Sequence, residues 1–195
     1  AETIMVMASI VKVRQARLSR GVIALLAMAA ILQPLLYSTR HDILLTRQDT
    51  RTLAKVWIET NVPSGTRIAL DWPVHGPPLS TSENQVPCSS RVYDVLVVGI
   101  GTSGLSNYPL EWYRAQGYDY LVASSFIYDI PLVYERRDAH RREFYASLDS
   151  ELELVRDFYP AENNDELPFI FNEIYGPAIA LWRRERPGPI IKIYR

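Results

Sequence analysis

The strongest feature of the hydrophobic pattern is an uncharged run at residues 21–37, with the sequence GVIALLAMAAILQPLLY. As an α-helix rising about 1.5 Å per residue, this run is roughly 25 Å long, close to the hydrocarbon core of a bilayer at about 30 Å. The two hydroxyl residues that follow can extend it. Gln33 and Pro34 are its least apolar positions, but proline is tolerated in spanning helices. The pattern predicts a transmembrane helix at residues 21–39.

Two other interpretations of this run stay open. A core helix buried in a soluble domain can have the same length and composition. A secretory signal also combines a basic start, an apolar centre and small residues, here Ala27, Ala29 and Ala30.

Basic residues before the run predict its orientation. Lysine and arginine beside a span tend to stay on the cytoplasmic side, and four of them precede residue 21: Lys12, Arg14, Arg17 and Arg20. Residues 40–195 are then extracytoplasmic, although three arginines on the far side, Arg40, Arg47 and Arg51, act against this orientation. The predicted location is a cell membrane, with the C-terminal domain outside.

Residues 1–20 are predicted to be the end of a preceding apolar helix followed by a basic cytoplasmic loop. Residues 4–11 (IMVMASIV) are apolar, and the basic cluster follows them. The chain is then expected to be the C-terminal piece of a polytopic membrane protein. A peripheral amphipathic segment is the alternative.

After residue 40, helical and strand periodicities alternate. Helices are predicted at residues 49–61, 109–116 and 136–150, and strands at residues 67–71, 92–98, 118–123, 152–158 and 190–194. Residues 92–98 (VYDVLVV) are apolar enough to predict a central strand. Residues 72–90 are rich in proline and serine and predict a long loop, either functional or mobile. The fold class is therefore α/β: one transmembrane helix, then a compact layered domain at residues 40–195 with a sheet of about five strands.

Composition narrows the function classes. The net charge of −1 gives no electrostatic footprint for nucleic acid. Cys88 is the single cysteine, so an internal disulfide is excluded. Three histidines (His41, His75 and His140) stand far apart without metal-ligand spacing, so no metal site is predicted.

A glycine motif directly follows the strand at residues 92–98. Gly99, Gly101 and Gly104 match G-x-G-x-x-G, in which glycines let a pyrophosphate approach the N-terminus of a helix. Here Asn107 and Pro109 interrupt the expected helix almost at once. The sequence therefore favours a glycine-rich loop without a nucleotide, and no cofactor is predicted.

Four polar residues follow two predicted strands and form the candidate substrate-binding site: Asp71, His75, Ser124 and Ser125. They meet if those strands are parallel neighbours, because parallel strands end at the same edge of a sheet. A Ser/His/Asp site is then conceivable, but the chain has no G-x-S-x-G nucleophile elbow. Polar residues that satisfy strand ends are the alternative, and no catalytic residue is assigned.

Several motifs together resemble the C-terminal end of bacterial multi-span glycosyltransferases of the GT-C type, which include protein mannosyltransferases and lipid A aminoarabinose transferases. After the apolar run come DTRTLAKVWIETNVPSGTRIAL, LEWYRAQGYDYLVASSFIYD, REFYASLDSELELVRDF and RPGPIIKIYR. The matching positions are Asp49, Arg51, Trp57, Ile58, Pro63 and Gly65 at the start, and Pro189, Ile191, Ile193 and Tyr194 at the end.

The resemblance implies a transferase that uses a polyprenyl-phosphate sugar donor at the outer membrane face. In such families the catalytic acidic residues lie in an early extracytoplasmic loop, which has no counterpart here. The domain is then non-catalytic and covers the active site or binds the acceptor. Expected partners are membrane lipid, a lipid-linked sugar, an acceptor and the rest of a polytopic protein. The alternative is a non-catalytic, membrane-anchored interaction subunit of a larger membrane complex.

Overall fold

The computed structural model describes residues 2–71, 74–98, 104–129, 139–167 and 180–195, with the backbone alone for residues 2–20. The chain divides into two compact units, Ala1–Ile43 and Leu44–Arg195.

The first unit is helical throughout its described length. Helix α1 covers Glu2–Leu45 and contains Pro34. It therefore runs without a break through residues 2–20, where the sequence predicted the end of one helix and a loop. From Gly21 the helix is long and apolar enough to cross a membrane, and none of its apolar window is buried. An apolar surface of this kind needs lipid or protein to cover it.

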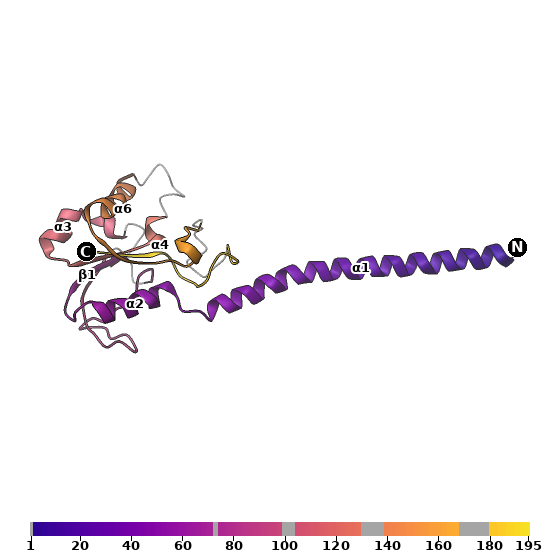
Figure 1. Ribbon diagram of the computed structural model, residues 1–195, viewed down its shortest axis with the longest axis horizontal. Coiled ribbons are helices and arrows are strands. Elements are labelled where there is room, and N and C mark those ends of the chain that lie inside the picture. Colours follow the sequence, from indigo (N-terminus) through magenta and orange to yellow (C-terminus); the bar gives the residue numbers. More distant parts are fainter. Residues whose placement is uncertain (1, 72–73, 99–103, 130–138, 168–179) are drawn as a thin grey trace. The chain divides into compact units, whose positions relative to one another are not determined.

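The second unit is an α/β domain with a five-stranded mixed sheet in the order β2-β1-β3-β5-β4 (Figure 1). The strands are β1 (Arg67–Asp71), β2 (Asp94–Val98), β3 (Tyr120–Ser124), β4 (Leu154–Phe158) and β5 (Ile191–Tyr194). Strand β1 pairs in parallel with β2 and β3, whereas β5 runs antiparallel to β3 and β4. The α/β class and the five strands were both predicted.

The helices α2 (Thr50–Asn61), α3 (Leu110–Gln116), α4 (Ser125–Tyr128) and α6 (Ala139–Glu151), with the 3₁₀ turns η1 (Gly104–Asn107) and η2 (Glu162–Asn164), complete the domain. Alternate residues of each strand face opposite sides of the sheet. Ile68 and Leu70 pack with Ile58 of α2, whereas Ala69 packs with Tyr113 of α3 and Leu148 of α6. The domain therefore has three layers, with α2 on one face and α3 and α6 on the other (Figure 1).

Strand β2 corrects one prediction. Its apolar sequence indicated a central strand, but β2 lies at an edge of the described sheet. Val97 is 42% exposed, and of the five residues only Val98 is buried. An edge strand can be as apolar as a central one, since periodicity reports side-chain character and not the number of neighbouring strands.

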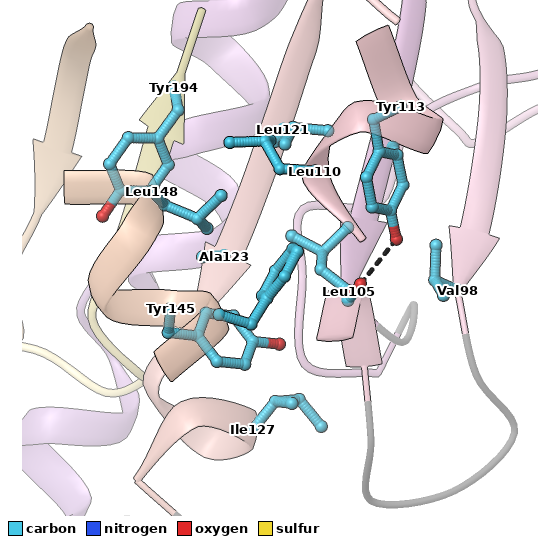
Figure 2. Packing of buried hydrophobic residues seen from close by; sticks show 12 residues of the cluster. Val98, Leu105, Leu110, Tyr113, Leu121, Ala123, Ile127, Tyr145, Leu148 and Tyr194 are labelled. Atoms are coloured by element: carbon cyan, nitrogen blue, oxygen red, sulfur yellow. Dashed lines mark hydrogen bonds between the residues drawn. The ribbon is translucent and has the colours of Figure 1, made fainter. Parts of the chain in front are cut away.

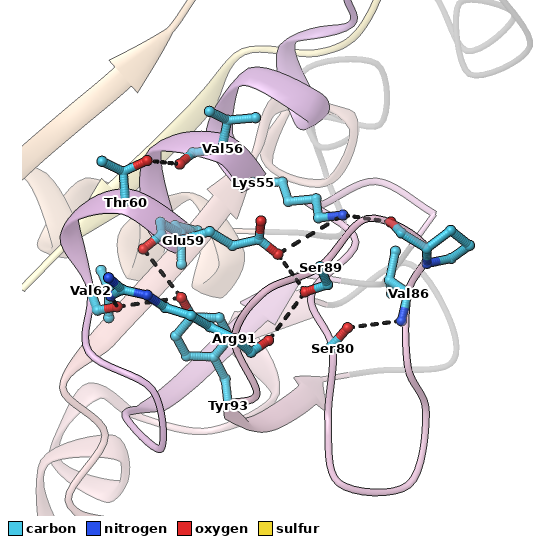
Figure 3. Close-up of polar contacts among 12 residues, drawn as sticks. Lys55, Val56, Glu59, Thr60, Val62, Ser80, Val86, Ser89, Arg91 and Tyr93 are labelled. Carbon is cyan, nitrogen blue, oxygen red and sulfur yellow. Dashed lines mark hydrogen bonds and ion pairs between the residues drawn. The ribbon is translucent and has the colours of Figure 1, made fainter.

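The loop before β2 is bound to α2 by a polar network (Figure 3). Ser89 donates to the Glu59 carboxylate at 2.5 Å, and Lys55 donates to the Pro87 carbonyl at 3.1 Å. Arg91 donates to the Val62 carbonyl at the C-terminus of α2. The described part of this predicted loop is thus attached to the domain at several points.

Candidate functional site

The candidate site is built around Asp71, the last residue of β1. Since β1 and β3 are parallel neighbours, Asp71 and Ser124 lie at the same edge of the sheet, as the sequence predicted for that arrangement. The Asp71 side chain is completely buried, and its Oδ2 accepts a hydrogen bond of 2.8 Å from the Ser124 backbone N–H. The carboxylate therefore ties the ends of two strands together.

The other carboxylate oxygen binds two further segments. Asp71 Oδ1 accepts from the Leu105 backbone N–H at 2.8 Å and from the Tyr145 hydroxyl at 2.7 Å. Figure 2 shows Tyr145 on α6 and Leu105 on η1 within one cluster of buried side chains. In the same cluster, Tyr113 donates to the Leu105 carbonyl at 2.7 Å. One carboxylate thus joins β1, β3, η1 and α6.

Close packing explains why the last position of the glycine motif, residue 104, is a glycine. Its φ of +54° lies in the left-handed region, and a Cβ there would stand 2.3 Å from Asp71 Oδ1 and 2.6 Å from the Tyr145 hydroxyl. Only glycine allows η1 to approach the carboxylate this closely. Gly99 and Gly101 lie outside the described residues. The described part of the motif therefore has a packing role.

Burial dominates the electrostatics of Asp71. Loss of solvent raises its pKa from 3.8 to about 6, and the hydrogen bonds from Tyr145, Ser124 and Leu105 and the charge of Arg141 oppose this rise. The pKa of this carboxyl is thus raised at a position that is not accessible to a solute.

Ser125 and His75 have other partners. Ser125 Oγ accepts from the Ile190 backbone N–H at 2.9 Å, and the Ser125 N–H donates to the Ile190 carbonyl at 2.9 Å. The buried His75 ring stands edge-on to Phe126, with 5.8 Å between ring centroids. Burial, helped by the Arg51 charge, lowers the pKa of His75. Asp71 therefore neither orients His75 nor activates a serine.

The hydroxyl of Ser124, unlike that of Ser125, has no bonding partner among the described residues. Its Oγ is also buried. A nucleophile must meet its substrate and a base, and this oxygen is closed to solvent. Substrate binding at the four predicted residues remains a prediction, while the described contacts give three of them a packing or bonding role.

Two partners of Asp71 were not predicted from the sequence. Leu105 donates through its backbone N–H. Because almost every residue type has this group, the identity of residue 105 gives no indication of the contact. Tyr145 lies in the helix predicted at residues 136–150, but its separation of 74 residues from Asp71 hides the contact. Among the residues that the structure describes, no group of three His, Cys, Asp or Glu side chains could hold a metal ion.

Comparison of the chain with protein-family models, with curated proteins and with solved structures gives no match.

Proposed function

We propose that this chain is the C-terminal span and extracytoplasmic domain of a glycosyltransferase that uses a polyprenyl-phosphate-linked sugar donor. In this proposal the α/β domain is non-catalytic and binds the acceptor or covers the active site. The chemistry of transfer belongs to acidic residues elsewhere in the protein.

The observation that carries the proposal is the order of features along one chain. A helix long and apolar enough to span a membrane ends at Leu45, and the elements of the resemblance follow it. Asp49 caps α2 by accepting from the Arg51 N–H at 2.8 Å, and it also accepts from the Arg51 guanidinium. Asp49 and Arg51, the first two matching positions of the resemblance, thus have a structural reason to occur together.

The state of Asp71 supports a non-catalytic domain. A general base or nucleophile needs a lone pair directed at the substrate. In Asp71 three donors occupy the buried carboxylate. The carboxylate of the candidate site is therefore bonded within the fold.

Native mass spectrometry of the protein purified from its own membrane in mild detergent tests the proposal. The spectrum is recorded before and after addition of polyprenyl-phosphate mannose, with a phosphatidylglycerol of similar charge as the control lipid. We expect a protein of several times 22.3 kDa that gains a polyprenyl-phosphate adduct and exchanges it for the added donor. Absence of any such adduct, together with a stoichiometric partner chain, would favour the interaction subunit instead.

A further inference from the structure

One edge of the sheet gathers the ends of several strands. The parallel strands β1 and β2 end there together, because Asp71 pairs with Val98. The parallel neighbour β3 ends there at Ser124, which pairs with Ile191, the first residue of β5. The last residue of β4, Phe158, also pairs with Ile191. We call this side of the domain the Asp71 edge. Segments that leave or enter these strand ends are therefore neighbours, although they are far apart in sequence.

Helix α2 begins at the same edge, and two loops of the edge are bonded to its first turn. The Thr50 hydroxyl donates to the Pro189 carbonyl at 2.6 Å, just before β5. The Arg51 guanidinium donates to the Val74 carbonyl at 2.5 Å, just after β1. Helix α1 ends at Leu45, five residues before Thr50, and an extended chain spans at most about 3.6 Å per residue. The Asp71 edge is thus the side of the domain at which the chain arrives from α1.

The segment that contains Trp182 is held at this edge as well. The Glu185 N–H donates to the Pro160 carbonyl at 2.9 Å, directly after the end of β4. The Arg183 N–H donates to the Ala180 carbonyl at 2.9 Å, which closes a turn around Trp182. Trp182 therefore stands in a turn next to the strand ends and not at a remote loop tip.

Apolar side chains are exposed at the Asp71 edge. Trp182 is 59% exposed and Val74 is 55% exposed, and Leu45 at the end of α1 is 54% exposed. Tryptophan is highly buried on average, so an indole left this open indicates a surface that another phase or molecule covers. Tryptophan is enriched at membrane–water interfaces, where its ring is covered and its N–H stays hydrated.

Charge does not select what covers this surface. Arg183 stands 2.8 Å from Asp165, and Arg186 stands 3.5 Å from Glu185, so both arginines beside the turn are next to acidic groups. An anionic surface is therefore not required. The exposed apolar side chains decide which surface fits, and the nearby α1 is long and apolar enough to cross a membrane.

We propose that the Asp71 edge contacts the membrane–water interface, with Trp182 and Val74 in the headgroup region. The occupant of this surface is the lipid bilayer that α1 crosses, since the chain arrives at this edge from α1. The domain then has contacts with the bilayer besides the span, and these contacts limit its rotation about the end of α1. The inference requires α1 to cross a membrane, but it does not depend on the sugar chemistry of the proposed function.

Fluorescence quenching of the full chain in phosphatidylcholine nanodiscs tests this contact. Phosphatidylcholine spin-labelled at the headgroup quenches tryptophan from the bilayer, and iodide quenches it from water. The difference between the wild type and Trp182→Phe gives the emission of Trp182 alone. We expect the spin-labelled lipid to quench most of this emission and iodide to quench little of it.

Trp112→Phe is the matched control, because Trp112 lies at the opposite edge of the sheet. It stacks on Tyr118, whose ring faces the guanidinium of Arg67, the first residue of β1. The emission of Trp112, obtained by the same difference, should not be quenched by the spin-labelled lipid. Val74→Asp keeps the backbone bond to Arg51 but puts a carboxylate at the interface, so it should lower the lipid quenching of Trp182 severalfold.

The inference is wrong if iodide, and not the spin-labelled lipid, quenches Trp182, or if the lipid quenches Trp112 as strongly as Trp182. Unchanged quenching of Trp182 in Val74→Asp would also contradict it. Melting temperatures show whether each variant is folded, and the comparison of lipid with iodide at Trp182 decides even if the control variant unfolds. Lipid quenching of Trp182 without a polyprenyl adduct would keep the membrane contact and reject the transferase, and the reverse result would do the opposite.

Discussion

At the scale of single residues, Asp71 combines complete burial with a raised pKa. Its carboxylate is completely buried, and its three donors among the described residues are two backbone N–H groups and one phenol. Burial of a charge is costly, which is why the pKa rises to about 6 despite these hydrogen bonds and the charge of Arg141. Stability of the domain should therefore depend on pH partly through this group.

The pH dependence has a definite sign. Between pH 3.8 and about 6 the folded protein keeps a proton on Asp71 that the unfolded chain has released, so stability falls as the pH rises through this window. The rise of the Asp71 pKa from 3.8 to about 6 corresponds to about 3 kcal/mol of folding free energy. In Asp71→Asn this contribution is absent. Urea unfolding at pH 4, 5, 6 and 7 should show the wild type losing stability relative to the variant, and a constant difference between the two would contradict the expectation.

Tyr145→Phe tests the phenol bond separately. The change removes the 2.7 Å hydrogen bond to Asp71 Oδ1 and keeps the ring that packs against Phe144 and Tyr128. We expect the free energy of unfolding at pH 7 to fall by about 1.5–3 kcal/mol, as for hydrogen bonds to charged groups, and the pKa of Asp71 to rise further. Tyr108→Phe is the control, because it removes the hydroxyl of a tyrosine that stacks on Trp112. An equal loss of stability in both variants would show that the bond from Tyr145 to Asp71 contributes nothing.

At the scale of elements, the segment before β5 fixes the position of α2. The Thr50 hydroxyl donates to the Pro189 carbonyl at 2.6 Å, and the Thr50 N–H donates to the Pro187 carbonyl at 3.2 Å. Gly188 lies between these two carbonyls, with a φ of +102°. The first turn of α2 is thus bonded to the segment just before β5, which lies 139 residues further along the sequence.

Gly188→Ala should separate these two elements. A Cβ at this position would stand 2.2 Å from Thr50 Oγ1, whereas a Cβ at Gly65, which also has a positive φ of +86°, would meet nothing within 4 Å. Both substitutions carry the left-handed penalty of about 1–2 kcal/mol, but only Gly188→Ala adds overpacking of about 1–3 kcal/mol. Unfolding in urea should therefore show the larger loss for Gly188→Ala. Equal losses would mean that the close approach does not matter.

Elements were easier to predict than contacts. Helix α2 begins after Asp49 and β1 covers Arg67–Asp71, as expected, because capping residues and apolar periodicity are local signals. The meeting of Asp71 with Ser124 was also predicted, on the condition that their strands were parallel neighbours. The edge position of β2 and the bond from Tyr145 were not, because both depend on how distant segments come together, which no local pattern encodes.

At the scale of the whole molecule, the direction in which the chain crosses a membrane is the prediction that most affects function. A polyprenyl-phosphate donor used at the outer face requires the α/β domain to be outside the cell. The basic residues before Gly21 favour this orientation. The arginines after the apolar run act against it, so the orientation is a matter of experiment.

Cys88 is a natural probe of this orientation, because it is the single cysteine of the chain and its side chain is exposed. A membrane-impermeant maleimide applied to intact cells should label the exposed Cys88 without lysis. In a Cys88→Ser background, Gln15→Cys should become labelled only after lysis, because position 15 lies on the predicted cytoplasmic side. The reverse pattern would place the domain in the cytoplasm and remove the basis for an outer-face sugar donor. Labelling of both cysteines in intact cells would show that the helix does not cross the membrane.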